Sequence, residues 1–334
     1  MSAPASRTVL VTGGAGYIGS HAVLALDAVG YKVVVIDDLS TGFRWAVPAH
    51  IPFYEGDIAD RALIDRIVAE QRPEAIMHFA GSIVVPESVA NPLKYYHNNT
   101  AKSRDLIDAA VAHGIGCFVF SSTAAVYGEP DVVPIAETAR PEPINPYGRS
   151  KLMTEWMLRD TAAAHPFRYV ALRYFNVAGA DPDCRTGQST AGATHLLKIA
   201  AEVIAGRRDG IKVFGTDYPT PDGTAIRDYI HVSDLARAHV RALDYLFADG
   251  APLVANCGYG RGFSVTEVLD AVEAACGASV NRHLAGRRAG DPPALIADND
   301  LVRTQLKWEP LYDDLSLIIE HAIAWEKALA SRSA

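Results

Sequence analysis

A glycine-rich segment close to the first residue places the strongest constraint on how this chain can fold. Gly13, Gly16 and Gly19 follow the apolar run Thr8–Thr12 and open a segment of helical character over residues 17–29. Glycine lets the backbone come close to a pyrophosphate, and a helix N-terminus offers free N–H groups and the positive end of the helix dipole. The order of strand, glycine turn and helix therefore predicts a dinucleotide site.

Two acidic residues at the end of the next strand favour NAD over NADP. Asp37 ends the apolar run Lys32–Asp37, and Asp38 follows it directly. An acid at this position binds the ribose hydroxyls, and a pair of acids repels the 2′-phosphate of NADP. Asp57 follows the third apolar run, where it lies either near the adenine or at the N-terminus of a helix, and the sequence leaves both interpretations open.

Short β-branched runs alternate with helical segments through the first half of the chain. This alternation predicts βαβ units and a parallel sheet that is covered on both faces. With right-handed crossovers, the fold class is α/β, with a Rossmann-like doubly wound parallel sheet. The further strands are expected at Ile51–Glu55, Ala75–Phe79, Cys117–Ser121 and Tyr169–Tyr174, and the helices at residues 60–71, 92–113 and 145–164.

The second half of the chain is less regular and predicts a smaller C-terminal α/β lobe. No low-complexity linker separates the halves, so we expect the second lobe to pack onto the first. Loops rich in Gly, Pro and Asp are typical of functional segments, and they are expected at residues 178–192, 215–223 and 286–293. Helices are expected over residues 193–206, 233–247, 264–276 and 314–329, and Ser264 and Glu267 have the spacing of a capping box for the third of these.

A tyrosine and a lysine four residues apart form the candidate catalytic pair. Tyr147 and Lys151 are expected on one face of a helix, because residues at this spacing are neighbours on a helix surface. A tyrosine with a pKa of about 10 needs about 4 kcal/mol of preferential stabilisation of its phenolate to act as a base near pH 7. The Lys151 cation and a positively charged nicotinamide both contribute to this. Thr123 lies at the carboxyl end of a strand, where doubly wound folds bind ligands and where its hydroxyl reaches a substrate oxygen.

Composition excludes several classes of function. The net charge of −8 disfavours nucleic acid and anionic membranes as partners, and no apolar run reaches the length of a membrane helix. The four cysteines have no CxxC spacing, which is typical of a reduced protein of the cytoplasm. No zinc or calcium motif is present, so no metal is expected. Residues 1–7 show no signal peptide.

Taken together, these motifs resemble the extended short-chain dehydrogenase/reductase superfamily. Within it, the chain is similar to the UDP-glucose (UDP-galactose) 4-epimerases over residues 9–325. The matching stretches include VTGGAGYIGSH, YGRSKL, LRYFNVAGA, FGTDYPTPDGTAIRDYIHV and RRAGDPPALIAD. The resemblance implies a tightly bound NAD, a UDP-sugar substrate and a 4-keto intermediate without net redox change.

The resemblance also implies residue roles. Tyr147 is the base, Lys151 binds the nicotinamide ribose and tunes Tyr147, and Thr123 contacts the substrate. The cofactor-binding residues implied, together with Tyr147 and Lys151, are Gly13, Gly16, Tyr17, Ile18, Gly19, Asp37, Asp38, Asp57, Ile58, Phe79, Ala80, Asn98, Ser121 and Tyr174. The substrate-binding residues implied, together with Thr123 and Tyr147, are Asn176, His195, Phe214, Arg227, Arg288, Asp291 and Leu295.

The chain departs from its relatives at several of these positions. His195 stands where some relatives carry Asn, Ile83 where some carry Lys, and the run Thr100–Ser103 replaces a more usual Asn-Gly-Thr. Leu295 stands where a Tyr in some members excludes N-acetylated sugars, so we expect a pocket that also admits N-acetylhexosamines.

Alternative functions remain open. Related 4,6-dehydratases carry an Asp-Glu pair where this chain has Ala124 and Ala125, so elimination of water is disfavoured. A 4-epimerase of UDP-xylose/UDP-arabinose or of a UDP-uronate remains an alternative. Two further alternatives come from different classes of function. They are a net NAD-dependent dehydrogenase and a non-catalytic NAD-binding sensor.

The domain limits are expectations from the sequence, and the assembly follows from the resemblance alone. We expect residues 1–175 to form the NAD-binding Rossmann domain, with the chain returning near 228–256, and residues 176–334 to form mainly the UDP-sugar-binding domain. The family usually forms homodimers, and by analogy the helices near 92–113 and 145–164 supply the interface.

Overall fold

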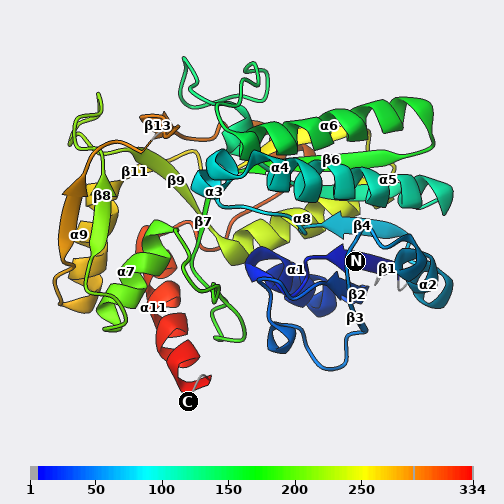
Figure 1. Ribbon diagram of the computed structural model, residues 1–334, viewed down its shortest axis with the longest axis horizontal. Coiled ribbons are helices and arrows are strands. Elements are labelled where there is room, and N and C mark those ends of the chain that lie inside the picture. Colours follow the sequence, from blue (N-terminus) through cyan, green and yellow to red (C-terminus); the bar gives the residue numbers. More distant parts are fainter. Residues whose placement is uncertain (1–6, 289, 333–334) are drawn as a thin grey trace.

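A parallel sheet of seven strands forms the centre of the computed structural model, which describes residues 7–288 and 290–332 (Figure 1). The strand order is β3-β2-β1-β4-β5-β6-β10, so the order reverses between β1 and β4. The first six residues, where the sequence shows no signal peptide, lie outside the described residues. The strands are β1 (Thr8–Thr12), β2 (Lys32–Asp37), β3 (Phe53–Glu55), β4 (Ala75–His78), β5 (Cys117–Thr123), β6 (Arg168–Tyr174) and β10 (Leu253–Cys257).

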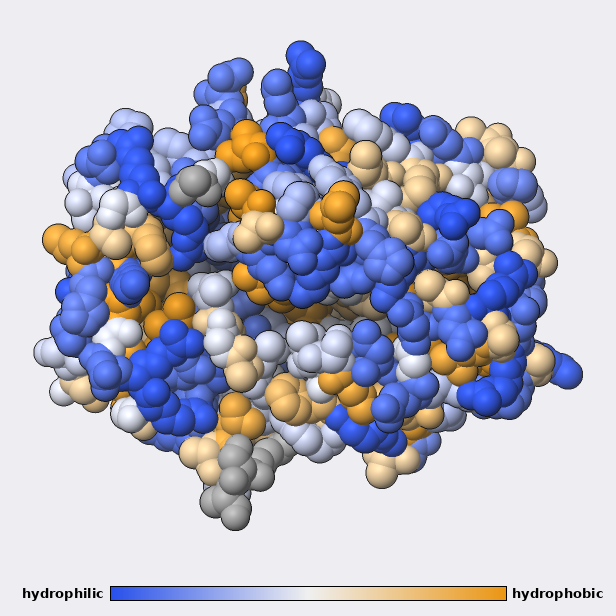
Figure 2. All heavy atoms as spheres, viewed as in Figure 1, coloured by the Kyte–Doolittle hydropathy of each residue, from blue (hydrophilic) through white to orange (hydrophobic). Residues whose placement is uncertain are grey.

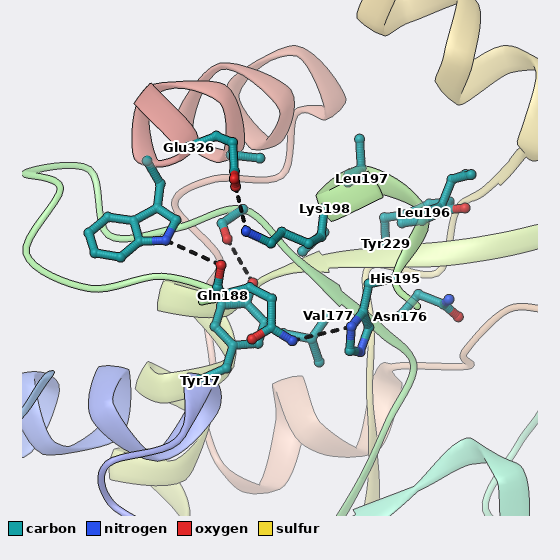
Figure 3. A pocket seen from close by; sticks show the side chains of 14 residues that line it. Tyr17, Asn176, Val177, Gln188, His195, Leu196, Leu197, Lys198, Tyr229 and Glu326 are labelled. Carbon is teal, nitrogen blue, oxygen red and sulfur yellow. Dashed lines mark hydrogen bonds and ion pairs between the residues drawn. The ribbon is translucent and has the colours of Figure 1, made fainter. Parts of the chain in front are cut away.

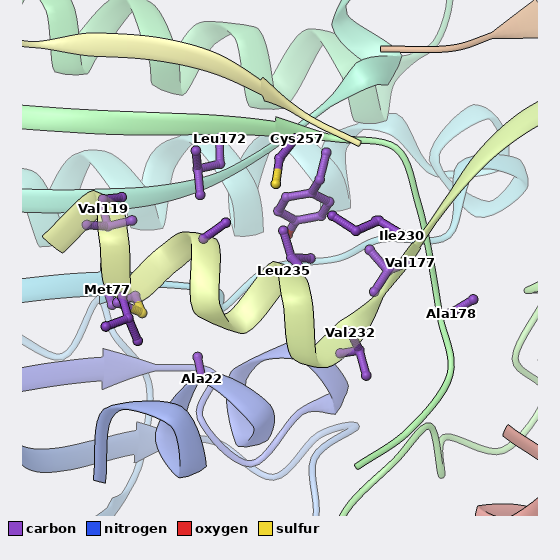
Figure 4. Packing of buried hydrophobic residues seen from close by; sticks show 14 of the residues in the cluster. Ala22, Met77, Val119, Leu172, Val177, Ala178, Ile230, Val232, Leu235 and Cys257 are labelled. Carbon is purple, nitrogen blue, oxygen red and sulfur yellow. The ribbon is translucent and has the colours of Figure 1, made fainter. Parts of the chain in front are cut away.

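Helices cover both faces of this sheet, which confirms the predicted doubly wound fold. Alternate strand residues point to opposite faces. Thus Val9 and Val35 join the cluster that contains α1 (Tyr17–Ala28) and α8 (Val232–Phe247). Leu10, in contrast, joins the cluster on the other face. The helices of that face are α2 (Arg61–Gln71), α5 (Lys102–Ala112) and α6 (Pro146–Ala164). Figure 4 shows α8 packed against side chains of the central strands.

The helix expected over residues 92–113 is interrupted. The structure has α3 (Val85–Ala90), which the sequence did not predict, then α4 (Pro92–Tyr95), a π-helical turn at Tyr96–Ala101 and finally α5. π-turns within helices are rare and frequent at functional sites. This one carries the candidate cofactor residue Asn98, which is thereby placed beside the loop that follows β4.

The second lobe is built around β9 (Ile226–His231). This strand pairs antiparallel with β11 (Gly262–Ser264) and parallel with β13 (Ala294–Leu295) and β7 (Asn176–Ala178). The other elements are β8 (Ile211–Phe214), β12 (Arg282–Ala285), α7 (Leu196–Ile204), α9 (Val265–Cys276), α10 (Asp300–Gln305) and α11 (Leu315–Arg332). The predicted capping box of Ser264 and Glu267 is present at the start of α9.

The two lobes share one apolar core. The cluster that covers the α1–α8 face of the large sheet continues into the second lobe through residues such as Leu197, Val268 and Trp308. The chain returns from β9 through α8 to β10, which pairs with β6 at the edge of the large sheet. No helix in residues 7–288 and 290–332 is long and apolar enough to cross a membrane.

Most of the strands predicted for the first half are confirmed, with small shifts in their ends. β3 begins at Phe53 rather than at Ile51, and β4 ends at His78. β5 extends to Thr123, whose hydroxyl also caps the 3₁₀ turn Ala124–Val126 by accepting from the Ala125 N–H at 3.1 Å.

Candidate active site

The glycine turn after β1 is built without room for side chains. Gly13 has φ +68°, and a Cβ placed on it would lie 2.6 Å from the backbone nitrogen of Ala80. A Cβ on Gly19 would overlap the carbonyl oxygen of Gly13. The turn lies where the strand order reverses, which is the place where doubly wound folds bind ligands. On the face in Figure 2, a hollow runs across the middle of the molecule, between α4 and α1 as labelled in Figure 1.

Asp37 and Asp38 lie beside this turn at the end of β2. The Asp37 carboxylate accepts hydrogen bonds from the backbone N–H of Ala15 at 2.9 Å and of Leu39 at 2.8 Å. Burial raises the pKa of Asp37, and these two bonds offset part of that effect. Asp38 accepts a bond from the Ser40 hydroxyl at 2.6 Å. Asp37 thus shapes the glycine turn in addition to its expected contact with a ribose.

A segment after β2 folds over the glycine turn. The backbone N–H of Phe43 donates to the carbonyl oxygen of Ala15 at 2.9 Å. A Cβ on Gly42 would lie 2.9 Å from the Ala15 backbone, so the approach is close. At the tip of the segment, the Trp45 ring lies 5.8 Å from the Trp325 ring of α11. The segment therefore connects the candidate cofactor site to the last helix.

Asp57 and Ile58 follow β3. Lys102 donates to Asp57 at 2.5 Å, and the backbone N–H of Ala59 donates to it at 2.9 Å. Burial raises the pKa of Asp57, but the bonds from Lys102 and Ala59 outweigh it, so the net pKa is lowered. The N-cap of α2 is Asp60, so the capping interpretation of Asp57 is wrong.

Residues after β4 form the wall opposite the turn. Phe79 and Ala80 follow the strand directly, and Ala80 lies against Gly13. The Asn98 side chain donates to the Ser82 hydroxyl at 3.1 Å. The sequence analysis missed the neighbouring Asn99. Its side chain accepts from the Ser82 N–H at 2.7 Å and donates to the Ser82 carbonyl oxygen at 2.9 Å.

The candidate catalytic pair lies on the first turns of α6. Asn145 caps this helix by accepting a hydrogen bond from the Gly148 N–H at 2.9 Å. Tyr147 is 9% exposed and Lys151 is 2% exposed. The Lys151 ammonium donates to the carbonyl oxygen of Ser121 at 3.0 Å, which ties it to the end of β5. The predicted cofacial arrangement is therefore present, with both side chains beside the strand end.

Burial dominates the electrostatics of this pair. It raises the pKa of Tyr147, and a hydrogen bond with the Thr123 side chain lowers it in part. Burial lowers the pKa of Lys151 to about 8. Lys151 therefore loses its proton before the Tyr147 phenol ionises.

Further candidate cofactor residues lie at the ends of β5 and β6 and at the start of α1. Tyr174 and Ser121 share a hydrogen bond between their hydroxyls. Tyr17, at the start of α1, donates to the carbonyl oxygen of Gly179 at 2.7 Å. Ile18 follows Tyr17 in the same turn of α1.

A buried ion pair lies beneath the strand end and was missed by the sequence analysis. Arg173 donates to both carboxylate oxygens of Glu155, at 2.9 and 2.5 Å. Ser122 donates to the same carboxylate at 2.5 Å. These contacts fasten α6 to β5 and β6, so they hold Thr123 and Tyr147 in register. Neither residue has a sequence signal beyond its place in a strand or helix.

A cleft of about 180 Å³, open to solvent, extends from Thr123 and Tyr147 to the second lobe. Its lining includes Thr123 and Tyr147 from the first lobe, and Asn176, Arg227, Asp291 and Leu295 from the second. Most of the expected substrate-binding residues therefore meet the catalytic ones in one place.

Two expected residues lie beside the cleft rather than in its lining. The Arg288 guanidinium lies 4.3 Å from the centre of the Phe214 ring, and it lies 3.9 Å from the Asp291 carboxylate. Arg227 donates to the carbonyl oxygen of Ile226 at 2.8 Å, and burial lowers its pKa. A ring and two guanidinium groups thus flank one end of the cleft.

Asp228, next to Arg227, holds this end together. Its carboxylate accepts backbone N–H bonds from Tyr259 and Gly260 at 2.9 Å each and from Ala297 at 3.2 Å. Burial raises the pKa of Asp228 to about 6. The carboxylate thereby joins β9 to the loop after β10 and to the segment after β13.

His195 lines a second, much smaller pocket of about 30 Å³ (Figure 3). Asn176 lines both this pocket and the main cleft, so the two are adjacent. Burial lowers the pKa of His195. The Gln188 side-chain nitrogen donates to His195 Nδ1 at 3.3 Å, and Lys198 pairs with Glu326 at 2.6 Å. In residues 7–288 and 290–332, no three His, Cys, Asp or Glu side chains gather to hold a metal ion.

A glycine turn at the reversal point of a parallel sheet, with a Tyr–Lys pair beside it, defines an NAD-dependent enzyme of the extended short-chain dehydrogenase/reductase superfamily. More closely, the sequence model of the NAD dependent epimerase/dehydratase family matches residues 9–258, and the chain belongs to this family.

Several known proteins resemble this chain over nearly its whole length. A UDP-glucose 4-epimerase of Azospirillum brasilense is 59% identical over 325 residues, which are 97% of this chain and 93% of that protein. The crystal structure of UDP-glucose 4-epimerase from Brucella ovis in complex with NAD is 48% identical, with a TM-score of 0.92, and covers 95% of this chain and 98% of that one. The UDP-Glc/GlcNAc 4-epimerase of Campylobacter jejuni is 47% identical, with a TM-score of 0.84, over 96% of this chain and 99% of that one.

Proposed function

We propose that the chain interconverts UDP-glucose and UDP-galactose by inverting carbon 4 of the hexose, with NAD as a retained cofactor and no net redox change. The observation that carries this proposal is the meeting of Tyr147, Lys151 and Thr123 at the end of β5, between the glycine turn and the cleft. The relatives named as UDP-glucose 4-epimerases favour UDP-hexoses over the pentose and uronate alternatives.

The residues around the glycine turn fit NAD. A Cβ at Gly13 or Gly19 would fill the space against the backbone, so the turn is shaped for close approach of a pyrophosphate. Asp37 and Asp38 supply acceptors for ribose hydroxyls and repel an additional phosphate. NAD bound here would take a hydride from carbon 4 of the sugar and return it to the opposite face.

Tyr147 moves the proton. Its phenolate takes the proton of the sugar 4′-hydroxyl and later returns it, while the Thr123 hydroxyl stabilises the phenolate through their hydrogen bond. The Tyr147 pKa must fall from above 10.0 to near neutral pH for this role. Once the positive nicotinamide brings it below about 8, Lys151 is still charged when Tyr147 ionises and lowers the pKa further.

The second lobe holds the nucleotide end of the substrate. We assign the diphosphate to Arg227 and Arg288, since guanidinium groups form paired, charge-assisted hydrogen bonds with phosphate oxygens. We assign Phe214, which lies against the Arg288 guanidinium, to the uracil, and Asp291 lines the cleft 3.9 Å from Arg288. Binding energy from the nucleotide leaves the hexose free to turn over between the two hydride transfers.

The small residues of the cleft bear on the reaction and on the substrate range. Ala124 and Ala125 line the cleft and offer no acid or base, which supports epimerisation over elimination of water. Leu295 is shorter than a tyrosine, so we propose that N-acetylhexosamines also fit. The named activity of the Campylobacter jejuni relative is consistent with this range.

Product analysis without added coenzyme tests the proposed function. Purified enzyme incubated with UDP-glucose, UDP-galactose, their N-acetyl forms or UDP-xylose should yield the carbon-4 epimers of the hexoses. Tyr147→Phe should keep its bound NAD and lose most turnover, whereas Tyr245→Phe, on α8, serves as the matched control and should remain active. Accumulation of NADH that depends on added NAD would indicate a net dehydrogenase, and bound NAD without any turnover would indicate a sensor.

We also propose a homodimer and a cytoplasmic location. α5 and α6 lie side by side (Figure 1), and α6 exposes the apolar side chains of Met153 and Trp156, the latter 47% exposed. These features support pairing of α5 and α6 with the same helices of a second copy. Cys117, Cys257 and Cys276 are free thiols, which supports a reducing compartment.

A further inference from the structure

We propose that Gln188 is a positioning residue. It fixes His195 in the tautomer whose Nε2 carries the proton, so that His195 presents an N–H donor to the anionic oxygens of the nucleotide diphosphate. This inference rests on the proposed function, because it concerns how the same site reads the charged part of its substrate.

The hydrogen bond between the two side chains sets the tautomer. Gln188 Nε2 lies 3.3 Å from His195 Nδ1. An amide nitrogen only donates, so Nδ1 must accept, and a neutral imidazole that accepts at Nδ1 carries its proton on Nε2. Gln188 Oε1 is buried and has no hydrogen-bond partner among the described residues. The contact with His195 is therefore the interaction that orients the Gln188 amide.

The surroundings keep Gln188 in place. The residue is 6% exposed, and its carbonyl oxygen accepts a hydrogen bond from Trp325 Nε1 at 3.3 Å. The neighbouring Gly187 packs so closely on the Trp325 ring that a Cβ there would lie 2.5 Å from it. The loop over residues 178–192, which the sequence marks only as rich in Gly, Pro and Asp, thus supports the Gln188 side chain.

The His195 ring lies beside the main cleft, because its pocket shares Asn176 with the cleft. Figure 3 shows the His195 ring between Gln188 and Asn176, and Asn176 also lines the main cleft. His195 is the residue directly before α7. Diphosphate oxygens accept hydrogen bonds and donate none, so only the tautomer with a proton on Nε2 complements them.

Among the described residues that line the pocket, no other titratable group takes over this role. Lys198 of α7 is already paired with Glu326 of α11 at 2.6 Å. Burial raises the pKa of Tyr17 from α1 and of Tyr229 from β9, so both remain protonated and neutral. Burial also lowers the pKa of His195, so the ring is neutral at neutral pH, and its tautomer decides whether it donates.

Gln188→Glu reverses the direction of the hydrogen bond between the two side chains. A carboxylate accepts from Nδ1–H, which raises the pKa of His195 and, once the ring is neutral, places the proton on Nδ1. For the Gln188→Glu variant loaded with NAD, titration calorimetry should show the Kd for UDP rising at least about tenfold from about pH 6 to about pH 9. The reason is that the hydrogen bond from His195 to the charged diphosphate is lost. The wild type and the matched surface control Gln305→Glu should change by less than about threefold.

Three further readouts separate positioning from a purely structural role. Long-range proton–nitrogen NMR of histidine-labelled wild type should show the His195 proton on Nε2. In a His195→Asn background, Gln188→Glu should no longer produce the pH effect. At saturating substrate, kcat of Gln188→Glu should fall far less than the UDP affinity.

Clear results would overturn the proposal. A proton on Nδ1 of His195 in the wild type, or a Gln188→Glu enzyme whose UDP affinity at high pH equals that of the wild type, contradicts it. If Gln188→Glu fails to fold, the wild-type NMR measurement still decides. Absence of epimerisation by the wild type would instead contradict the proposed function, because UDP binding and the tautomer are measured without turnover.

Discussion

Replacing Lys151 with methionine tests how the catalytic tyrosine is activated. Methionine keeps the volume of the buried side chain and removes its charge. Side chains four apart on a helix lie about 6 Å from each other, and at an effective dielectric constant of about 20 one cation stabilises the phenolate by about 3 kcal/mol. That energy corresponds to about two pKa units. Lys151 thus supplies about two units of the fall that brings the Tyr147 pKa near 7, and the bound nicotinamide supplies the rest.

The assay is the pH dependence of kcat for enzyme preloaded with NAD. In the wild type, activity rises with pH as Tyr147 ionises. In Lys151→Met this rise should move up by about two pH units, with about 100-fold lower activity near pH 7. Arg149→Met removes an exposed charge from the same helix and should leave the profile in place. NAD released on denaturation checks that cofactor content is equal. A rise at the wild-type pH in Lys151→Met would refute the reasoning.

Four other substitutions test the site and the assembly. The pKa of Asp228 in the folded protein, about 6, exceeds its unfolded value of 3.8, so the native state binds the proton more tightly. The wild type therefore loses about 3 kcal/mol of stability as pH rises from about 4 to about 6. Asp228→Asn should not show this loss of stability. It should be less stable than the wild type at all pH values, because its amide nitrogen cannot accept backbone N–H bonds. Parallel curves of melting temperature against pH for the variant and the wild type would contradict this. Leu295→Tyr should lower turnover of UDP-N-acetylhexosamines relative to UDP-hexoses, and an unchanged ratio of the two rates counts against a role of this side chain. Trp45→Ala removes an aromatic contact worth about 1 kcal/mol and should release NAD about fivefold faster in a stopped-flow or dialysis measurement, whereas equal release would show that the segment after β2 does not retain the cofactor. Trp156→Glu should shift the protein to monomer in sedimentation velocity, and an unchanged sedimentation coefficient would place the dimer interface elsewhere.

Local patterns in the sequence predicted the parts of the site that are close together along the chain. The glycine turn, the acids at the end of β2 and the Tyr–Lys pair of α6 each depend on spacing within one element or one turn. Periodicity likewise gave the helices and strands of the first half, because buried parallel strands read as continuous apolar runs.

Contacts between distant segments were not predictable in the same way. The pairing of Arg173 with Glu155 and of Gln188 with His195 joins elements whose relative position depends on the whole fold. The short strands around β9 escaped notice because two to four residues show no clear period. The π-turn at Tyr96–Ala101 also has no simple pattern, since it is stabilised by contacts of Asn99 with Ser82 and Ser150.

The position of β10 has a consequence for the synthesis of the protein. This strand completes the edge of the large sheet beside β6, and α8, just before it, covers the same face as α1. Both elements come from residues 232–257, long after the glycine turn has left the ribosome. Until they arrive, the nascent chain carries an open strand edge and an uncovered apolar face, the features on which chaperones and aggregation act. The large sheet is therefore completed late in synthesis, although its β1 strand is among the first residues made.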